Sequence, residues 1–317
     1  AAGKRELAFA HAQQNGALFH RVQQISQGIV RSLGDLAAWA DYPEDEIPAV
    51  TPESLHAALQ PVLEQLDSTL ATYDYGRILQ SGVSAVIVGK PNVGKSTLFN
   101  LLSGSQRSIV TEIAGTTRDV VEEQIRLGNV TLRLSDTAGL RETEDVIEQM
   151  GVKIAEERLA QADLILAVFD TTRPLDDDDR RMLEQLPEKP VIAILNKSDQ
   201  SAQLDTDELE PYFSRVITMA AREGSGLEQL QQAVEELFYQ AEVTPELGIV
   251  ANARQKQCLE QAREQVQLAL EALDAGELLD AVTVLLEEAA DALLTLTGER
   301  VSEAVVNDVF SRFCVGK

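Results

Sequence analysis

The stretch GKPNVGKS, residues 89–96, decides the fold of this chain. An apolar run at 83–88 leads directly into it, and a helical pattern at 97–102 follows it. Its glycines permit a tight turn whose backbone N–H groups face the phosphates of a nucleotide, Lys95 can reach the outer phosphates, and the Ser96 hydroxyl can bind Mg²⁺. We therefore predict a phosphate-binding loop between a strand and a helix.

Two later motifs indicate which nucleotide binds. The sequence DTAG, residues 136–139, ends a predicted strand, so that Asp136 supplies a carboxylate for the Mg²⁺ shell and Gly139 can follow a γ-phosphate. The sequence NKSD, residues 196–199, follows another apolar run, and Asp199 can accept two hydrogen bonds from guanine that adenine does not offer. Each motif alone also occurs as an ordinary polar turn. Three in this order, each after a strand, predict a guanine nucleotide, GTP or GDP.

Composition indicates a globular protein of the cytoplasm. A chain of 317 residues is long enough for two domains, and 44% hydrophobic with 25% charged residues is typical of folded chains. The two cysteines, Cys258 and Cys314, lie far apart and predict no disulfide framework. Because no apolar run approaches the roughly 20 residues that a bilayer requires, we expect no membrane partner.

The net charge of −25 argues against broad attraction to nucleic acid, since phosphate contacts need clustered lysine and arginine. A role on RNA would need a local basic face or a partner protein. The acidic run at 176–179 follows the loop sequence DTTRP, residues 170–174. We interpret it as solvated surface and assign it no chemistry.

Helical and alternating patterns divide the chain. Helix-spaced apolar residues at the start of the sequence predict a first helical stretch. A second helix is predicted from Pro52 or Glu53 to about Tyr75. Strands and helices then alternate as far as about residue 240, which predicts a mainly parallel sheet covered by helices. The predicted strands are 83–88, 120–127, 130–134, 164–169, 191–195 and 216–219, and the helices that follow the alternating region are 252–273, 278–295 and 302–313.

The two helical segments each show a wide apolar face that must be buried. The economical arrangement packs them together, so that an α/β G domain of the P-loop class is inserted into a discontinuous all-α domain. The expected boundaries are 1–81 for the first helical part, 82–242 for the G domain and 243–317 for the second helical part.

The segment TEIAGTTRD, residues 111–119, and the terminal CVGK, residues 314–317, accompany the nucleotide motifs inside this helical frame. Together they resemble the MnmE (TrmE) family of tRNA-modifying GTPases, as does DYPEDEI at 41–47. The first segment is shared with Era and Der GTPases, whereas the terminal Cys-x-Gly-Lys separates the families. The resemblance covers essentially the whole chain. Family members begin with a further folate-binding domain, which implies that a folate site lies outside this chain.

The resemblance also implies how hydrolysis works. Ras-like proteins orient the water with a glutamine at the position of Leu140, which has no donor or acceptor; the family uses a glutamate that matches Glu148. Glu148 and Lys95 are therefore the expected catalytic residues. Ras-like proteins neutralise the developing charge with an inserted arginine, but we interpret Arg118 and Arg141 as surface or local ion-pair residues. The family instead uses K⁺, with ligands that match Asn92, Thr111, Ile113 and Thr116. Thr117 joins Ser96 on Mg²⁺, with Asp136 in an outer position.

The last guanine loop departs from the usual Ser-Ala-Lys or Ser-Ala-Arg, because it reads Ala220-Ala221-Arg222. The N–H of Ala221 can still meet the guanine oxygen, but the bracing serine hydroxyl is missing. We therefore expect modest affinity for the base. The complete predicted nucleotide set is Asn92, Val93, Gly94, Lys95, Ser96, Thr97, Thr111, Thr116, Thr117, Asp136, Gly139, Asn196, Lys197, Asp199, Ala220, Ala221 and Arg222.

The resemblance implies a potassium-stimulated GTPase that pairs its G domains in the triphosphate or transition state. With an FAD-dependent partner of the MnmG (GidA) type it would modify C5 of the wobble uridine of tRNA with a carboxymethylaminomethyl or aminomethyl group. Cys314 is the candidate tRNA-modification residue, and Cys258 is interpreted as packing. One alternative is an Era- or Der-type ribosome-assembly switch, although such proteins carry an RNA-binding domain or a second G domain. A module that only binds nucleotide is disfavoured by the intact Lys95, Thr117 and Asp136.

Overall fold

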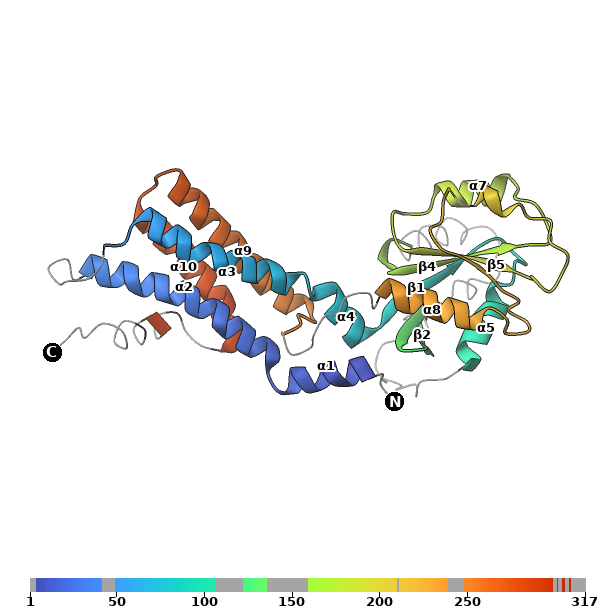
Figure 1. The fold of residues 1–317 in the computed structure, drawn as a ribbon, viewed down its shortest axis with the longest axis horizontal. Coiled ribbons are helices and arrows are strands. Elements are labelled where there is room, and N and C mark those ends of the chain that lie inside the picture. The colour runs from blue at the N-terminus through green and yellow to red at the C-terminus, as the bar shows by residue number, and fades with distance from the viewer. Residues whose placement is uncertain are drawn as a thin grey trace, which may run out of the picture. The chain divides into compact units, whose positions relative to one another are not determined.

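A computed structural model shows two compact units (Figure 1). One comprises Ser81–Glu242 with Ala1–Lys4, and the other joins Arg5–Gln80 to Val243–Lys317. We call them the sheet unit and the helical unit. The predicted helix at 302–313 lies almost entirely outside the described residues. The residues that the structure describes are 4–41, 49–105, 122–135, 159–209, 211–238, 248–298, 301, 304, 305 and 308.

The helical unit joins segments from both ends of the sequence. Helices α2 (Ala17–Asp41) and α3 (Pro52–Leu70) lie side by side with α9 (Ala253–Asp274) and α10 (Leu279–Thr297) (Figure 1). Their apolar faces share one core, in which residues such as Ile25, Leu59, Leu259 and Leu286 are fully buried. This confirms the discontinuous helical domain, because neither segment could bury its apolar face alone. A shorter helix, α1 (Lys4–Gln14), precedes α2.

Side-chain caps determine where two of these helices begin. Thr51 precedes α3, and its hydroxyl accepts from the Ser54 N–H (3.2 Å) while its own N–H donates to the Ser54 hydroxyl (3.0 Å). Asn252 caps α9 in the same reciprocal way with Gln255. Such boxes satisfy N–H groups that have no partner within the helix. These local signals fix the helix starts independently of the core.

The predicted single helix from 52 or 53 to about 75 is wrong, because two helices occupy that region. The first, α3, ends at Leu70, and α4 spans Tyr73–Ser81. At the break, the Thr72 hydroxyl donates to the Thr69 carbonyl (2.7 Å) and accepts from the Val250 N–H (3.0 Å). A Cβ on Gly76 would lie 2.0 Å from the Val250 carbonyl oxygen, so only glycine permits this approach. A contact with the distant second segment therefore replaces the continuous helix.

The described part of the sheet unit contains six strands in the order β2-β3-β1-β4-β5-β6, and all neighbours are parallel except β2 and β3. This confirms the predicted P-loop α/β fold. The predicted strand ends agree with the observed ones to within two residues. Because the parallel strands end at one edge, the loops that follow β1, β5 and β6 can gather there. The strands are β1 (Val83–Val88), β2 (Glu122–Leu127), β3 (Val130–Ser135), β4 (Leu164–Asp170), β5 (Val191–Asn196) and β6 (Val216–Thr218).

Helices α5 (Lys95–Ser105), α7 (Asp177–Glu184) and α8 (Leu227–Phe238) belong to this unit, with a short 3₁₀ helix at Thr206–Glu208. The start of α7 corrects the interpretation of the acidic run as solvated surface. Asp176 is the N-cap of α7, and Asp179 is only 1% exposed because Arg173 binds both of its carboxylate oxygens. Two of the four acids are thus structural.

Within the described part of the chain, no helix combines the length and the apolar character that a membrane span requires.

Candidate nucleotide-binding site

The loop between β1 and α5 packs closely against the ends of the neighbouring strands β4 and β5. Gly89 (φ 144°), Asn92 (φ 65°) and Gly94 (φ 106°) all adopt positive φ. A Cβ on Gly94 would lie 2.1 Å from Nδ2 of Asn196, and one on Gly89 would lie 2.4 Å from the carbonyl oxygen of Val168. Asparagine tolerates the left-handed region better than most side chains, whereas the two glycines are required by space as well as by φ. The loop is therefore shaped by its backbone.

Lys95 opens α5 and reaches back across this loop. Its Nζ donates to the carbonyl oxygens of Gly89 (2.7 Å) and Lys90 (2.7 Å). Burial lowers the pKa of the Lys95 ammonium. The positive charge is thus held beside N–H groups at a helix N-terminus, which is a favourable environment for phosphate.

Ser96 and Thr97 lie exposed in the first turn of α5. A hydroxyl is a hard oxygen donor of the kind that Mg²⁺ prefers, and one beside a phosphate-binding loop fits an ion that also contacts the phosphates. The residues present therefore fit Mg²⁺, with Ser96 as the ligand among the described residues.

Asn196, at the end of β5, fastens two loops together. Its Nδ2 donates to the Val93 carbonyl (2.8 Å), and its Oδ1 accepts from the Ala221 N–H (3.0 Å). The residue is 4% exposed, so both bonds are shielded from water. Because Val93 belongs to the phosphate loop and Ala221 follows β6, one side chain joins the phosphate-binding and base-binding parts of the site.

The Ala221 contact modifies the sequence-based prediction. Its N–H was expected to meet the guanine oxygen, but in the structure it donates to Asn196. The loop is further attached to β5 through the Ser198 N–H, which donates to the Met219 carbonyl (3.1 Å). Ala220 is buried, whereas Asp199 and Arg222 are exposed near the same strand ends. The side chain of Asp199 is thus accessible to a base.

Lys197 and two aspartates form contacts that the sequence analysis missed. Lys197 adopts a φ of 67°, and its Nζ lies 2.6 Å from Oδ2 of Asp170, the last residue of β4. Burial acts to raise the pKa of Asp170, but hydrogen bonds from Lys197 and Thr172 outweigh it and lower that pKa. Asp176 similarly pairs with Lys90 of the phosphate loop. The available signal was that Asp170 ends a buried strand and that Asp176 lies in the loop that follows the same strand.

Several predicted site residues lie outside the described part of the chain. They are Thr111, Ile113, Thr116, Thr117, Asp136, Gly139, Glu148 and Cys314. Cys258 is described, lies in α9 and is partly exposed.

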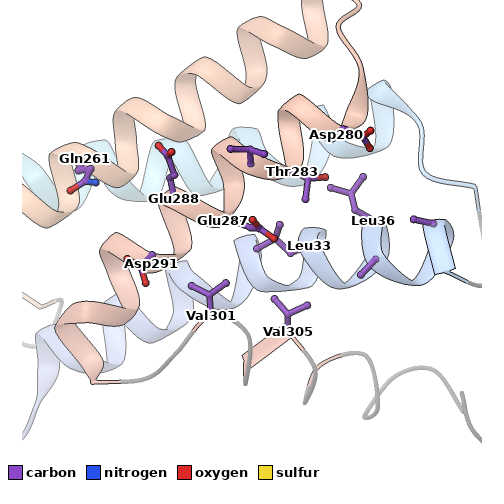
Figure 2. Close-up of a pocket in the computed structure, with 13 residues that line it drawn as sticks. Leu33, Leu36, Gln261, Asp280, Thr283, Glu287, Glu288, Asp291, Val301 and Val305 are labelled. Atoms are coloured by element: carbon purple, nitrogen blue, oxygen red, sulfur yellow. The ribbon is translucent and has the colours of Figure 1, made fainter.

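A cavity of about 880 Å³ lies in the helical unit between α2 and α10. Figure 2 shows its apolar side chains, among them Leu33 and Val305, together with carboxylates from α10. No lysine or arginine lines it among the described residues. Because its four acids, Asp280, Glu287, Glu288 and Asp291, would repel phosphates, the candidate nucleotide site is the one built on Lys95 and Asn196.

Comparisons with known proteins identify the family of this chain. The family model described as the MnmE helical domain matches residues 1–314. The tRNA modification GTPase MnmE of Acetivibrio thermocellus is 38% identical over 97% of this chain and 68% of its own length. That of Geobacter metallireducens is 39% identical over 98% of this chain and 68% of its own length.

Among solved structures, a crystal structure of Aquifex aeolicus Era bound to GDP.AlF4- is similar over 59% of this chain and 67% of that chain, with 30% identity and a TM-score of 0.40. The family assignment follows from the sequence relatives. Since one family model spans nearly the whole sequence and these curated members are 38% and 39% identical to it over 97% and 98% of this chain, the chain belongs to the MnmE family of tRNA modification GTPases.

Proposed function

We propose that this chain hydrolyses GTP to drive tRNA modification, in company with an FAD-dependent protein of the MnmG (GidA) type. The product would carry a carboxymethylaminomethyl or aminomethyl group at C5 of the wobble uridine. The observation that carries the proposal is the Asn196 junction, which joins a lysine-containing phosphate loop to a guanine-type loop in a chain of this family.

Phosphoryl transfer depends mainly on positioning and on neutralising charge, and each candidate site residue that the structure describes has a role in it. Lys95 offers its ammonium to the outer phosphates, and Ser96 offers a hydroxyl to Mg²⁺. Asp199 accepts hydrogen bonds from guanine, while Asn196 holds the loops in register. Bound Mg²⁺ would neutralise phosphate charge, with Thr117 and Asp136 as its further predicted partners.

Potassium is the proposed second cation. Asn92 is exposed and adopts a left-handed backbone conformation within the phosphate loop, so this loop carries an exposed amide oxygen. Amide and carbonyl oxygens suit a weakly hydrated monovalent ion. We propose Asn92, Thr111, Ile113 and Thr116 as its ligands, and face-to-face pairing of two G domains when it is bound.

The proposal predicts a specific loss from tRNA. Disrupting the gene in its source organism should remove C5-substituted wobble uridines from total tRNA, because no GTP-driven step would support their formation. Nucleoside mass spectrometry measures the change. Expression of the wild-type protein should restore the nucleosides, whereas Lys95→Ala should not, since it lacks the charge that contacts the phosphates.

Unchanged wobble nucleosides in tRNA after disruption of the gene would contradict the proposal. If immature ribosomal RNA accumulated instead, the result would support the alternative of an Era- or Der-type assembly switch.

A further inference from the structure

The acidic start of α7 contacts the phosphate-binding loop. We propose that Asp176 is a positioning residue for this loop, acting through its ion pair with Lys90 to orient Lys95. The inference rests on the proposed function, because it concerns how the same site binds its nucleotide. It assigns a role to acidic residues that the motifs do not include.

The two oxygens of Asp176 serve different partners. Oδ1 accepts from the N–H groups of Asp178 (3.1 Å) and Asp179 (3.2 Å), and so caps α7. Oδ2 accepts from the Lys90 ammonium and from Arg173 (3.2 Å). The helix start therefore fixes the carboxylate, and the fixed carboxylate holds the lysine.

The support for Asp176 extends into the core. Arg173 also binds Asp179, with Nη1 2.7 Å from Oδ2, and the Asp179 side chain is only 2% exposed. Two hydrogen bonds hold this arginine on the buried carboxylate, because breaking them would leave a buried charge unpaired. Asp176, whose side chain is 51% exposed, is thus attached through Arg173 to a buried acid.

Lys90 links Asp176 to Lys95. Its side chain is 22% exposed, pairs with Asp176 and lies 3.6 Å from Oδ2 of Asp178. Its carbonyl oxygen accepts from Lys95 Nζ (2.7 Å). One residue therefore receives the contact from α7 on its side chain and orients the Lys95 ammonium with its backbone. The hydrogen bond with Asp176 also raises the pKa of Lys90, so the pair stays charged at neutral pH.

The expected consequence concerns affinity more than turnover. Lys90 and Asp176 hold the empty loop in its phosphate-ready shape, and without them that ordering must occur upon binding. Pairs of this exposure are worth about a two- to fivefold change in an equilibrium constant. We expect GDP and GTP to bind about two- to fivefold more weakly when the pair is broken, while turnover at saturating GTP changes much less.

Asp176→Asn is the informative variant, because asparagine is also a good N-cap and removes only the charge. Dissociation constants for a fluorescent GDP analogue should rise for Asp176→Asn and for Lys90→Met, stay near wild type for Lys90→Arg, and show no further rise in the double variant. The differences should shrink at about 1 M salt, which screens exposed charges. The matched control is Glu236→Gln, which removes an ion pair with Arg215 (2.7 Å) in the same unit.

Three results would overturn the inference. Unchanged affinity in Asp176→Asn would show that the ion pair does not position the loop. An equal loss in Glu236→Gln would show a general effect of removing surface charge, and additive losses in the double variant would show that the two residues act separately. If the wild-type protein bound no guanine nucleotide at all, the proposed function would fail, and the inference with it.

Discussion

Replacing Glu148 by alanine is expected to lower GTP turnover by a factor of about 10²–10⁴ while leaving nucleotide affinity near normal. The position after the DTAG motif, Leu140, has no polar group with which to orient a water molecule. Another residue must do so, and Glu148 is the proposed one, although it lies outside the described residues. A carboxylate that contacts only the attacking water contributes to the transition state and little to ground-state binding.

Single-turnover hydrolysis and equilibrium binding of a GTP analogue, measured on the same samples, separate these effects. Glu144→Ala is the matched control, because it removes a carboxylate from the same segment. A variant of Glu148 that lost nucleotide binding together with turnover would indicate a structural role. Equal turnover in the Glu148 and Glu144 variants would remove the assignment.

Asn196→Ala is expected to weaken nucleotide binding by about 10²-fold, because each buried group left unpaired costs about 1–3 kcal/mol. The substitution leaves the Val93 carbonyl and the Ala221 N–H without the side chain that joins them. The phosphate loop and the loop after β6 would then be free to separate in the empty protein. Both loops would have to be ordered again by the nucleotide, so binding is affected more than the chemical step.

Isothermal titration with GDP measures this loss directly. Asn129→Ala provides the control, because Asn129 is exposed and its amide donates to Glu235 at the β2–β3 turn of the same unit (3.2 Å). We expect Asn129→Ala to bind GDP normally. Near-normal affinity in Asn196→Ala would mean that the two loops hold their positions without this junction.

The nucleotide loops were predictable because their signals are local. Glycines at fixed spacing after an apolar run specify the turn at 89–96 without reference to the rest of the chain, and the strands follow from short apolar runs bounded by turns. The insertion of the sheet unit was also predictable, since two helical segments with unburied apolar faces need each other. The structure and the family comparison confirm this fold.

The features that sequence reasoning missed depend on distant partners. From the sequence alone, Asp176 is one of four acids expected to be solvated. Its role depends on Lys90, which lies 86 positions away in the sequence and pairs with it in the structure. The break between α3 and α4 depends on Val250, and Asp170 acquires its role through Lys197, which follows the neighbouring strand β5. Spacing along the chain carries no information about such pairs. The roles proposed for Asn92, Glu148 and Cys314 remain predictions.

GTP turnover in K⁺ and in Na⁺ tests the central claim most directly, namely the proposal that K⁺ stimulates GTP hydrolysis by this chain. At equal ionic strength the two salts screen charge equally, so only specific coordination can distinguish them. Phosphate release should be faster in KCl than in NaCl, and the rate per chain in KCl should rise with protein concentration as G domains pair. Equal rates per chain in the two salts, at every protein concentration, would contradict the account.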